Sequence, residues 1–216
     1  MASLSPERVR SNLLEVREEI AAAAARAGRD SREVEIVAAV KYLAGSDLPA
    51  LADGGLEIVA ENRAQALIEK VAFAQGRLRW HFIGALQSRK IRQIAPRVEL
   101  IHSVASDSVL EELARHAPPG LEILVEVNVA GDPGKAGISP ANLEAFIARS
   151  PVPVVGLMTM PPLTDDAERS RPFFEELARL AREQGLRHVS AGTSQDFAVA
   201  VEAGATFVRL GTRLYR

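Results

Sequence analysis

A lysine at the end of an apolar run is the first candidate for chemistry in this chain. Residues 34–40 are mostly β-branched or small and apolar, and Lys41 follows them directly. Alternate side chains of a strand share a face, so Lys41 is expected beside Ala39 and Val37. If that face is buried, desolvation disfavours the ammonium form, and the free amine can attack a carbonyl carbon. The alternative is a lysine that ends a strand in water, where most lysines lie.

The choice of basic residues draws further attention to the lysines. Lysine and arginine together number 26, and only Lys41, Lys70, Lys90 and Lys135 are lysine. A chain that otherwise carries its positive charge on arginine has reason to keep lysine where arginine cannot do the same task.

The elements that would position Lys41 form an alternating pattern of strands and helices. Strands are predicted at residues 34–40, 56–60, 78–84, 98–104, 121–128, 152–160, 188–192 and 205–211. Helices are predicted between them at 47–52, 63–74, 87–95, 107–116, 140–148, 165–184 and 194–203. This alternation is typical of an α/β protein with a parallel sheet, and eight units predict a single (β/α)8 TIM-type barrel formed by residues 1–216. A doubly wound open sheet is the alternative.

An extra N-terminal helix precedes the first strand. Ser5, Pro6 and Glu7 form a helix start, and apolar residues at helical spacing continue to Gly28. Because no helical pattern follows the eighth strand, we expect this first helix to fill the vacant place in the outer ring.

The composition excludes several classes of function. The formal net charge is −2 without a basic run, which argues against nucleic acid and membrane surfaces as partners. There is no cysteine, and the four histidines lack metal-ligand spacing, so neither a disulfide nor a metal site is expected. No segment approaches the roughly 20 apolar residues of a membrane span. A soluble cytoplasmic protein is therefore expected.

Small and hydroxyl residues follow the last two predicted strands. Thr193 and Ser194 come after strand seven, and Gly211 and Thr212 come after strand eight. Barrels often bind phosphate with these two loops, through backbone N–H groups and a helix N-terminus. The alternative for Ser194 is a simple helix cap.

Two polar residues are predicted inside the barrel. Arg209 shares a strand face with Phe207 and Gly211, and a buried guanidinium needs a partner because it cannot lose its charge. That partner is either a ligand or an interior carboxylate such as Glu126. His81 lies in an apolar strand and is either a satisfied core residue or a site residue. Near the end of strand six, Met158 and Met160 are expected to pack in the core.

Together these residues describe a site for a phosphorylated aldehyde. Lys41 would hold the aldehyde as a Schiff base, and the loops after strands seven and eight would hold the phosphate. Pyridoxal 5′-phosphate fits, with Arg209 facing its ring nitrogen. A lysine aldolase that acts on a sugar phosphate fits the same residues nearly as well.

A specific segment near the third predicted strand is Trp-His-Phe-Ile-Gly-Ala-Leu-Gln-Ser-Arg-Lys at 80–90. Shorter recognisable segments lie at 39–41, 61–65, 102–104, 127–128, 135–137, 156–158, 190–196 and 208–211. In residue types, order and spacing, these segments resemble the pyridoxal phosphate homeostasis proteins over essentially the whole chain.

This resemblance implies an alanine racemase-like barrel that carries pyridoxal 5′-phosphate on Lys41. Arg209 would face the pyridine nitrogen, and Ser194, Gly211 and Thr212 would hold the phosphate. The full set of cofactor-binding positions would be Lys41, Asn62, His81, Met158, Ser190, Ser194, Arg209, Gly211 and Thr212. The family is regarded as regulating vitamin B6 balance, so pyridoxal 5′-phosphate-dependent apo-enzymes are candidate partners.

Five positions depart from the family pattern. Tyr42 stands in place of Thr, Ala60 of Gly, Ala66 of Glu, and Ala191 and Thr193 of two methionines. None of them removes a group expected to touch the cofactor. The two in strand seven alter the phosphate side of the site.

Two features argue for a binding protein without strong turnover. A permanent cation at the ring nitrogen keeps that nitrogen unprotonated and weakens the electron sink that stabilises a carbanion. A two-base racemase needs a second acid or base besides Lys41, and the only tyrosines are Tyr42 and Tyr215. A protein without strong catalytic turnover is therefore expected, with an amino-acid racemase or lyase as the alternative. A monomer is expected because no long apolar helix face is left over once the barrel is closed.

Overall fold

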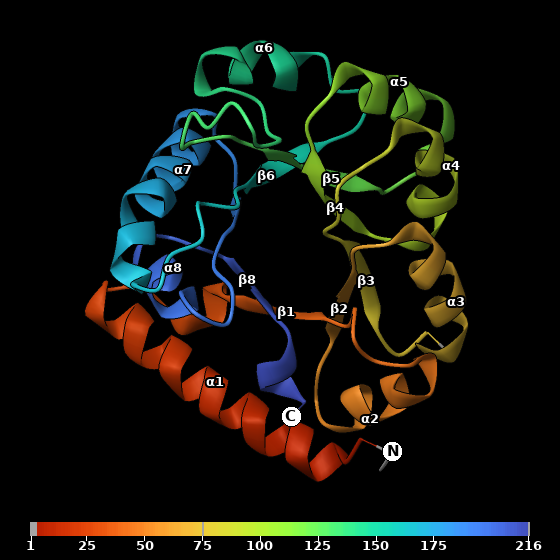
Figure 1. The fold of residues 1–216 in the computed structure, drawn as a ribbon, viewed down its shortest axis with the longest axis vertical. Coiled ribbons are helices and arrows are strands. Elements are labelled where there is room, and N and C mark those ends of the chain that lie inside the picture. The colour runs from red at the N-terminus through yellow and green to blue at the C-terminus, as the bar shows by residue number, and fades with distance from the viewer. Residues whose placement is uncertain (1–3, 75, 216) are drawn as a thin grey trace.

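Eight parallel strands close into a barrel in sequence order, with β8 returning to pair with β1 (Figure 1). The computed structural model describes residues 4–74 and 76–215. The strands are β1 (Glu35–Ala39), β2 (Ile58–Glu61), β3 (Arg79–Phe82), β4 (Leu100–Val104), β5 (Glu122–Glu126), β6 (Val154–Met158), β7 (His188–Ser190) and β8 (Phe207–Leu210). The predicted (β/α)8 barrel is confirmed, and the open-sheet alternative is wrong.

Helices surround the barrel. Their bounds are α1 (Pro6–Arg26), α2 (Leu48–Asp53), α3 (Ala64–Ala74), α4 (Ile91–Ile94), α5 (Asp107–His116), α6 (Leu143–Ala148), α7 (Arg171–Glu183) and α8 (Phe197–Glu202). Short 3₁₀ turns adjoin several of them, such as η3 (Ser88–Lys90) before α4, and a further turn, η7 (Thr212–Leu214), follows β8. Within the described residues, no helix is long and apolar enough to cross a membrane.

Helix α1 fills the place in the ring between α8 and α2, as expected (Figure 1). It begins at Pro6, and the Ser5 hydroxyl caps it by accepting a hydrogen bond from the N–H of Arg8 at 3.4 Å. Its apolar face is buried, and Arg26 near its end pairs with Glu202 of α8 at 2.6 Å. The N-terminal helix therefore closes the outer layer over β1 and β8.

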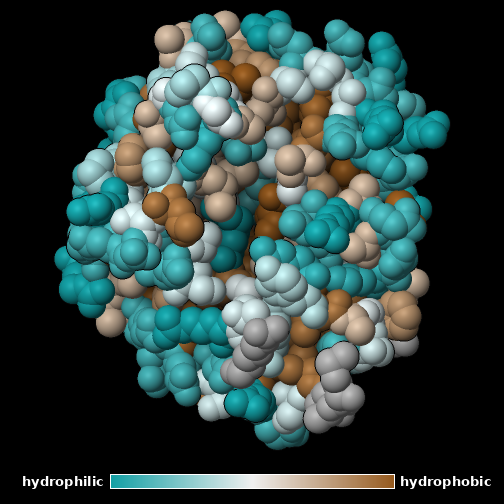
Figure 2. All heavy atoms as spheres, in the orientation of Figure 1, coloured by the Kyte–Doolittle hydropathy of each residue, from teal (hydrophilic) through white to brown (hydrophobic). Residues whose placement is uncertain are grey.

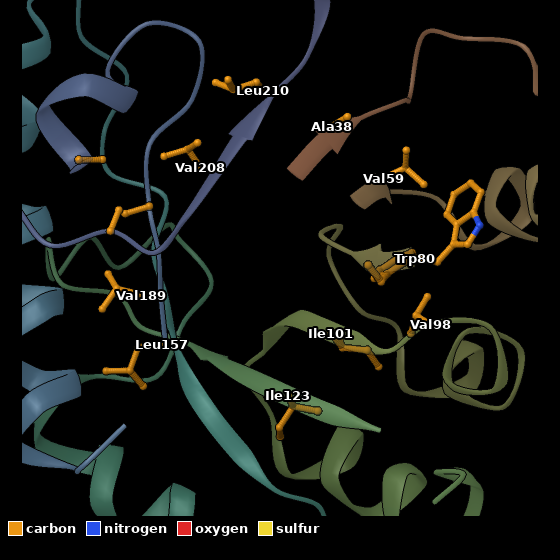
Figure 3. Packing of buried hydrophobic residues seen from close by; sticks show 14 of the residues in the cluster. Ala38, Val59, Trp80, Val98, Ile101, Ile123, Leu157, Val189, Val208 and Leu210 are labelled. Atoms are coloured by element: carbon orange, nitrogen blue, oxygen red, sulfur yellow. The ribbon is translucent and has the colours of Figure 1, made fainter. Parts of the chain in front are cut away.

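The strands separate two apolar layers. One set of side chains, which includes Ala38, Val59 and Val208, points outward from the strands toward the helices (Figure 3). Their sequence neighbours Val37 and Ile58 belong to a second buried cluster inside the barrel. This alternation follows from the two-residue repeat of a strand. It also decides which polar residues enter the barrel.

The strands and several helices are shorter than predicted, and the difference matters after β7. Helix α8 begins at Phe197 and has six residues, whereas the sequence predicted a helix from Ser194. The Asp196 carboxylate accepts hydrogen bonds from the backbone N–H and hydroxyl of Thr193 at 2.7 and 3.1 Å, which closes a turn before the helix. Ser194 is therefore not a helix cap. A phosphate bound here would be held by the backbone N–H groups of the loop and not by the N-terminus of a helix.

Candidate functional site

Lys41 stands beyond the end of β1. The strand ends at Ala39, and the Lys41 side chain is exposed, with its Nζ 4.9 Å from the centroid of the Tyr42 ring. Of the two alternatives for Lys41, the lysine that ends a strand in water is the one the structure shows, because the buried part of the strand ends before it. The amine is accessible at the mouth of the barrel.

Asn62 follows β2 and carries a buried polar atom for which the described residues offer no partner. Its side-chain oxygen, Oδ1, is buried and lacks a hydrogen-bond partner among the residues described. Its backbone lies so close to Gly84 that a Cβ at Gly84 would be 2.0 Å from the Asn62 carbonyl oxygen. Gly84 therefore allows the segment that follows β3 to approach Asn62. A buried acceptor without a partner is typical of a position that meets a ligand.

Arg209 is buried on the inner face of β8 and is held by neutral groups. Its Nη1 donates to the Ser190 hydroxyl at 2.7 Å, and its Nη2 donates to the Thr159 carbonyl at 3.0 Å. No ion pair joins Arg209 to Glu126 or to any other acid in the described part of the chain. Burial lowers the pKa of Arg209 to about 10, and the more distant Asp196 and Glu126 charges oppose that shift. The guanidinium is therefore still charged at neutral pH.

Ser190 connects Arg209 to two buried histidines. Its Oγ lies 2.8 Å from His102 Nδ1, and His102 Nε2 lies 3.0 Å from His81 Nδ1. Burial lowers the pKa of His81 to about 3 and that of His102 well below its ordinary value. Both imidazoles are therefore neutral at pH 7, and one proton in each contact satisfies the chain of hydrogen bonds.

His81 lies toward the amino-terminal ends of the strands. It contributes to a cavity of about 280 Å³ whose other lining residues include Arg79 and Glu99. A chain of hydrogen bonds through His102 and Ser190 links it to Arg209. His102 was absent from the predicted site residues, and the signal for it was a polar residue on the inner face of the fourth strand.

The two methionines near the end of β6 have different environments. Met158 is 2% exposed and belongs to the cluster inside the barrel, as predicted. Met160 is 49% exposed, so the prediction of core packing is wrong for this residue. Its sulfur lies 2.9 Å from Arg209 Nη2 at the edge of the barrel mouth.

The loops after β7 and β8 lie side by side and leave backbone donors open. Arg209 N–H donates to the Gly192 carbonyl at 3.0 Å, which joins the two segments. Within the described residues, the N–H groups of Ser194, Gly211 and Thr212 donate to no protein acceptor. A Cβ at Gly211 would find its nearest neighbours 3.9 Å away, so this position has room around it. The loops can therefore supply hydrogen bonds to an anion.

A cavity opens at the same end of the barrel. It has a volume of about 850 Å³, and its lining includes Glu126, Met160, Thr193 and Asp196. Burial raises the pKa of Glu126, and the Arg209 charge opposes that shift. Figure 2 shows the face that carries η7, and this face is hollowed near its centre. An exposed amine, a buried cation and open N–H groups thus lie around one barrel mouth.

The residues present fit a phosphorylated aldehyde cofactor. The buried Asn62 oxygen can accept a hydrogen bond from a ligand, and the loop N–H groups can donate to a phosphate. Lys41 supplies an accessible amine. Among the described residues, no hydrogen bond joins it to Arg209. Lys41, Asn62, Ser194, Gly211 and Thr212 therefore share the mouth, whereas His81 lies deeper in the barrel.

Comparisons with known proteins identify relatives of this chain. No family model matches the chain. A pyridoxal phosphate homeostasis protein of Aquifex aeolicus is 37% identical, over 94% of this chain and 95% of that protein. The structure of PipY from Synechococcus elongatus with pyridoxal 5′-phosphate bound superimposes with a TM-score of 0.79 at 28% identity, over 96% of this chain and all of that one.

A more distant structure shows the likeness of the fold alone. Alanine racemase from Corynebacterium glutamicum superimposes with a TM-score of 0.71 at 14% identity, over 98% of this chain and 61% of that one. The predicted alanine racemase-like barrel is therefore confirmed as a fold. With 37% identity to a relative over nearly its full length, the chain belongs to the family of pyridoxal phosphate homeostasis proteins.

Proposed function

We propose that this protein holds pyridoxal 5′-phosphate as a Schiff base on Lys41 and takes part in the homeostasis of that cofactor in the cell. The observation that carries this proposal is the grouping of an accessible amine, a buried cation and open loop N–H groups at one barrel mouth. It is supported by the relatives' name and by the related structure with pyridoxal 5′-phosphate bound.

Each predicted site residue has a stated task in this proposal. When bound, the cofactor supplies an aldehyde that condenses with an amine. Lys41 provides that amine, and Arg209 directs a charged N–H donor toward the ring nitrogen. The loop N–H groups of Ser194, Gly211 and Thr212 bind the phosphate, while Asn62, Met158 and Ser190 border the ring. His81 does not touch the ring in this proposal and affects Arg209 through His102 and Ser190.

A carrier suits these residues better than an enzyme. Arg209 keeps its charge at neutral pH, because its pKa is about 10, and this keeps a ring nitrogen in contact with it unprotonated. The Tyr215 hydroxyl donates to the Ala39 carbonyl at 3.0 Å and is therefore engaged in a structural contact. An exposed Lys41 would also allow the cofactor to exchange with an amine of a partner. Cytoplasmic apo-enzymes that need pyridoxal 5′-phosphate are the proposed recipients, and we expect a monomer.

The proposal is tested by adding pyridoxal 5′-phosphate to the purified protein and following imine absorbance. We expect absorbance that is lost in Lys41→Ala and kept in the matched control Lys90→Ala. No imine absorbance from the unaltered protein would refute the proposal and favour a sugar-phosphate aldolase.

The racemase or lyase alternative has a separate test. Chiral analysis of free amino acids after incubation with the loaded protein would reveal turnover. A carrier leaves the amino acids unchanged, whereas turnover that disappears in Lys41→Ala would establish an enzyme.

A further inference from the structure

A buried ion pair lies behind the site, and the function proposed above assigns it no task. Lys70 of α3 and Glu61 at the end of β2 are 8% and 1% exposed, and Lys70 Nζ lies 2.6 Å from Glu61 Oε2. Glu61 alternates with the inward-facing Ala60, so the pair lies on the helix side of the barrel wall. Neither side chain can touch a ligand in the barrel mouth from there.

The pair bonds to the backbone immediately before Lys41 and at Asn62. Lys70 Nζ donates to the Val40 carbonyl at 2.7 Å, and Val40 is the residue that precedes Lys41. The second carboxylate oxygen of Glu61, Oε1, accepts from the N–H of Asn62 at 2.8 Å. The Val40 N–H also donates to the Ala60 carbonyl at 3.0 Å. Two adjacent strand ends are thus tied by one charged pair.

Stability alone is a weak reason for such a pair. Taking two charges out of water is costly, and apolar residues of similar volume often serve as well or better. What an ion pair adds is direction, because its hydrogen bonds fix particular backbone atoms. Lys70 is also one of the few lysines in a chain that otherwise uses arginine, and its compact ammonium reaches Val40 and Glu61 together.

We propose that the Glu61–Lys70 pair is a positioning device that sets Lys41 and Asn62 relative to one another for cofactor binding. The inference rests on the proposed function for the identity of the ligand. Its structural part, a local restraint on the two strand ends, is a property of the chain without any ligand.

The test uses the double variant Glu61→Gln/Lys70→Met in the full-length chain. A single substitution would leave one buried charge unpaired and endanger the fold, whereas this variant is neutral and keeps similar volumes. The amide oxygen that replaces the Glu61 carboxylate can still accept from Asn62, but the contact with the Val40 carbonyl is lost. Glu99→Gln, which weakens an exposed pair with Arg79 at the other end of the barrel, is the matched control.

Two measurements separate positioning from a merely structural role. The first is backbone hydrogen exchange of the protein without pyridoxal 5′-phosphate, and the second is the rate of imine formation after its addition. We expect the double variant to exchange faster at residues 40–43 and 61–63 than elsewhere in the barrel. We also expect imine formation to slow by about tenfold or more, since small misplacement of a reacting group is costly. Glu99→Gln should change neither.

Uniformly faster exchange with an unchanged rate of imine formation would overturn the inference and leave the pair a structural role only. If the unaltered protein forms no imine, the proposed function fails. The exchange pattern then decides the restraint by itself: a local increase supports it, and a uniform one overturns it.

Discussion

At the scale of single residues, Arg209 has the most unusual environment, because it is a buried cation with neutral hydrogen-bond partners. It is a buried cation held by a hydroxyl, a carbonyl and a thioether, with no acid in direct contact among the described residues. Ser190 is the centre of this arrangement, because it meets both Arg209 and His102. The orientation of the Arg209 guanidinium therefore depends on the neutral histidines behind it.

His102→Leu tests this dependence. The substitution leaves the Ser190 hydroxyl and His81 Nδ1 without the partner they share, and each unsatisfied buried group costs roughly 1–3 kcal/mol. We expect denaturant unfolding to show a loss of that order, together with weaker binding of pyridoxal 5′-phosphate. His116→Leu, at the exposed end of α5, is the control and should shift stability by less than about 0.5 kcal/mol. Equal effects of the two substitutions would contradict the role given to His102.

At the scale of elements, the loops after β7 and β8 place two glycines under different constraints. Gly192 has φ +86°, and a Cβ there would be 2.7 Å from the Ala200 Cβ of α8. Gly211 has a negative φ and open space around it. The first glycine is required by packing and backbone conformation, whereas the second is proposed to leave room for a phosphate.

Alanine substitutions should separate these two reasons. Gly192→Ala is expected to lower the free energy of unfolding by about 1–3 kcal/mol, through backbone strain and overpacking against α8. Gly211→Ala should leave thermal stability nearly unchanged and reduce affinity for pyridoxal 5′-phosphate. Thermal melts and cofactor titrations of both variants measure the two effects. A stable Gly192→Ala, or a Gly211→Ala with unaltered affinity, would refute the corresponding assignment.

At the scale of the whole molecule, burial of histidines links folding to pH. Burial lowers the pKa values of His81, His102 and His188 in the folded state. Unfolded histidines have a pKa of about 6.5, so below that pH the unfolded chain binds more protons than the folded one. Stability contributed by these groups is therefore present above pH 6.5 and is lost as the pH falls.

Equilibrium unfolding between pH 7 and 5 should reveal this linkage. Each histidine that stays neutral when folded contributes a slope of up to about 1.4 kcal/mol per pH unit. We expect the free energy of unfolding to fall toward pH 5, and the slope to be smaller in His102→Asn than in the unaltered protein. A stability that is constant or rises toward pH 5 would contradict the burial of neutral histidines.

The fold could be predicted from the sequence because the patterns that specify it are local. Alternating apolar strands and helical patterns identify the barrel without knowledge of distant contacts, and the pattern near Ser5 locates α1. The end of β1 was harder to predict from the sequence. The strand ends at Ala39, and Lys41 is exposed. A one- or two-residue difference in a strand end is enough to change the environment of a site residue.

Contacts between side chains across the barrel could not be predicted from the sequence. Ser190 and His102 are 88 residues apart in the chain, and their contact depends on the register of every strand between them. Lys70 was noticeable only as one of four lysines. Its partners, Glu61 in β2 and the carbonyl of Val40 just after β1, lie 9 and 30 residues away, and the contact with Val40 depends on how β1 pairs with β2.

Reduction with borohydride tests the central claim most directly. Protein mixed with pyridoxal 5′-phosphate is reduced, digested and examined by peptide mass spectrometry. The account predicts one stable phosphopyridoxyl adduct, on the peptide that contains Lys41. An adduct confined to another lysine, or no adduct at all, would contradict it.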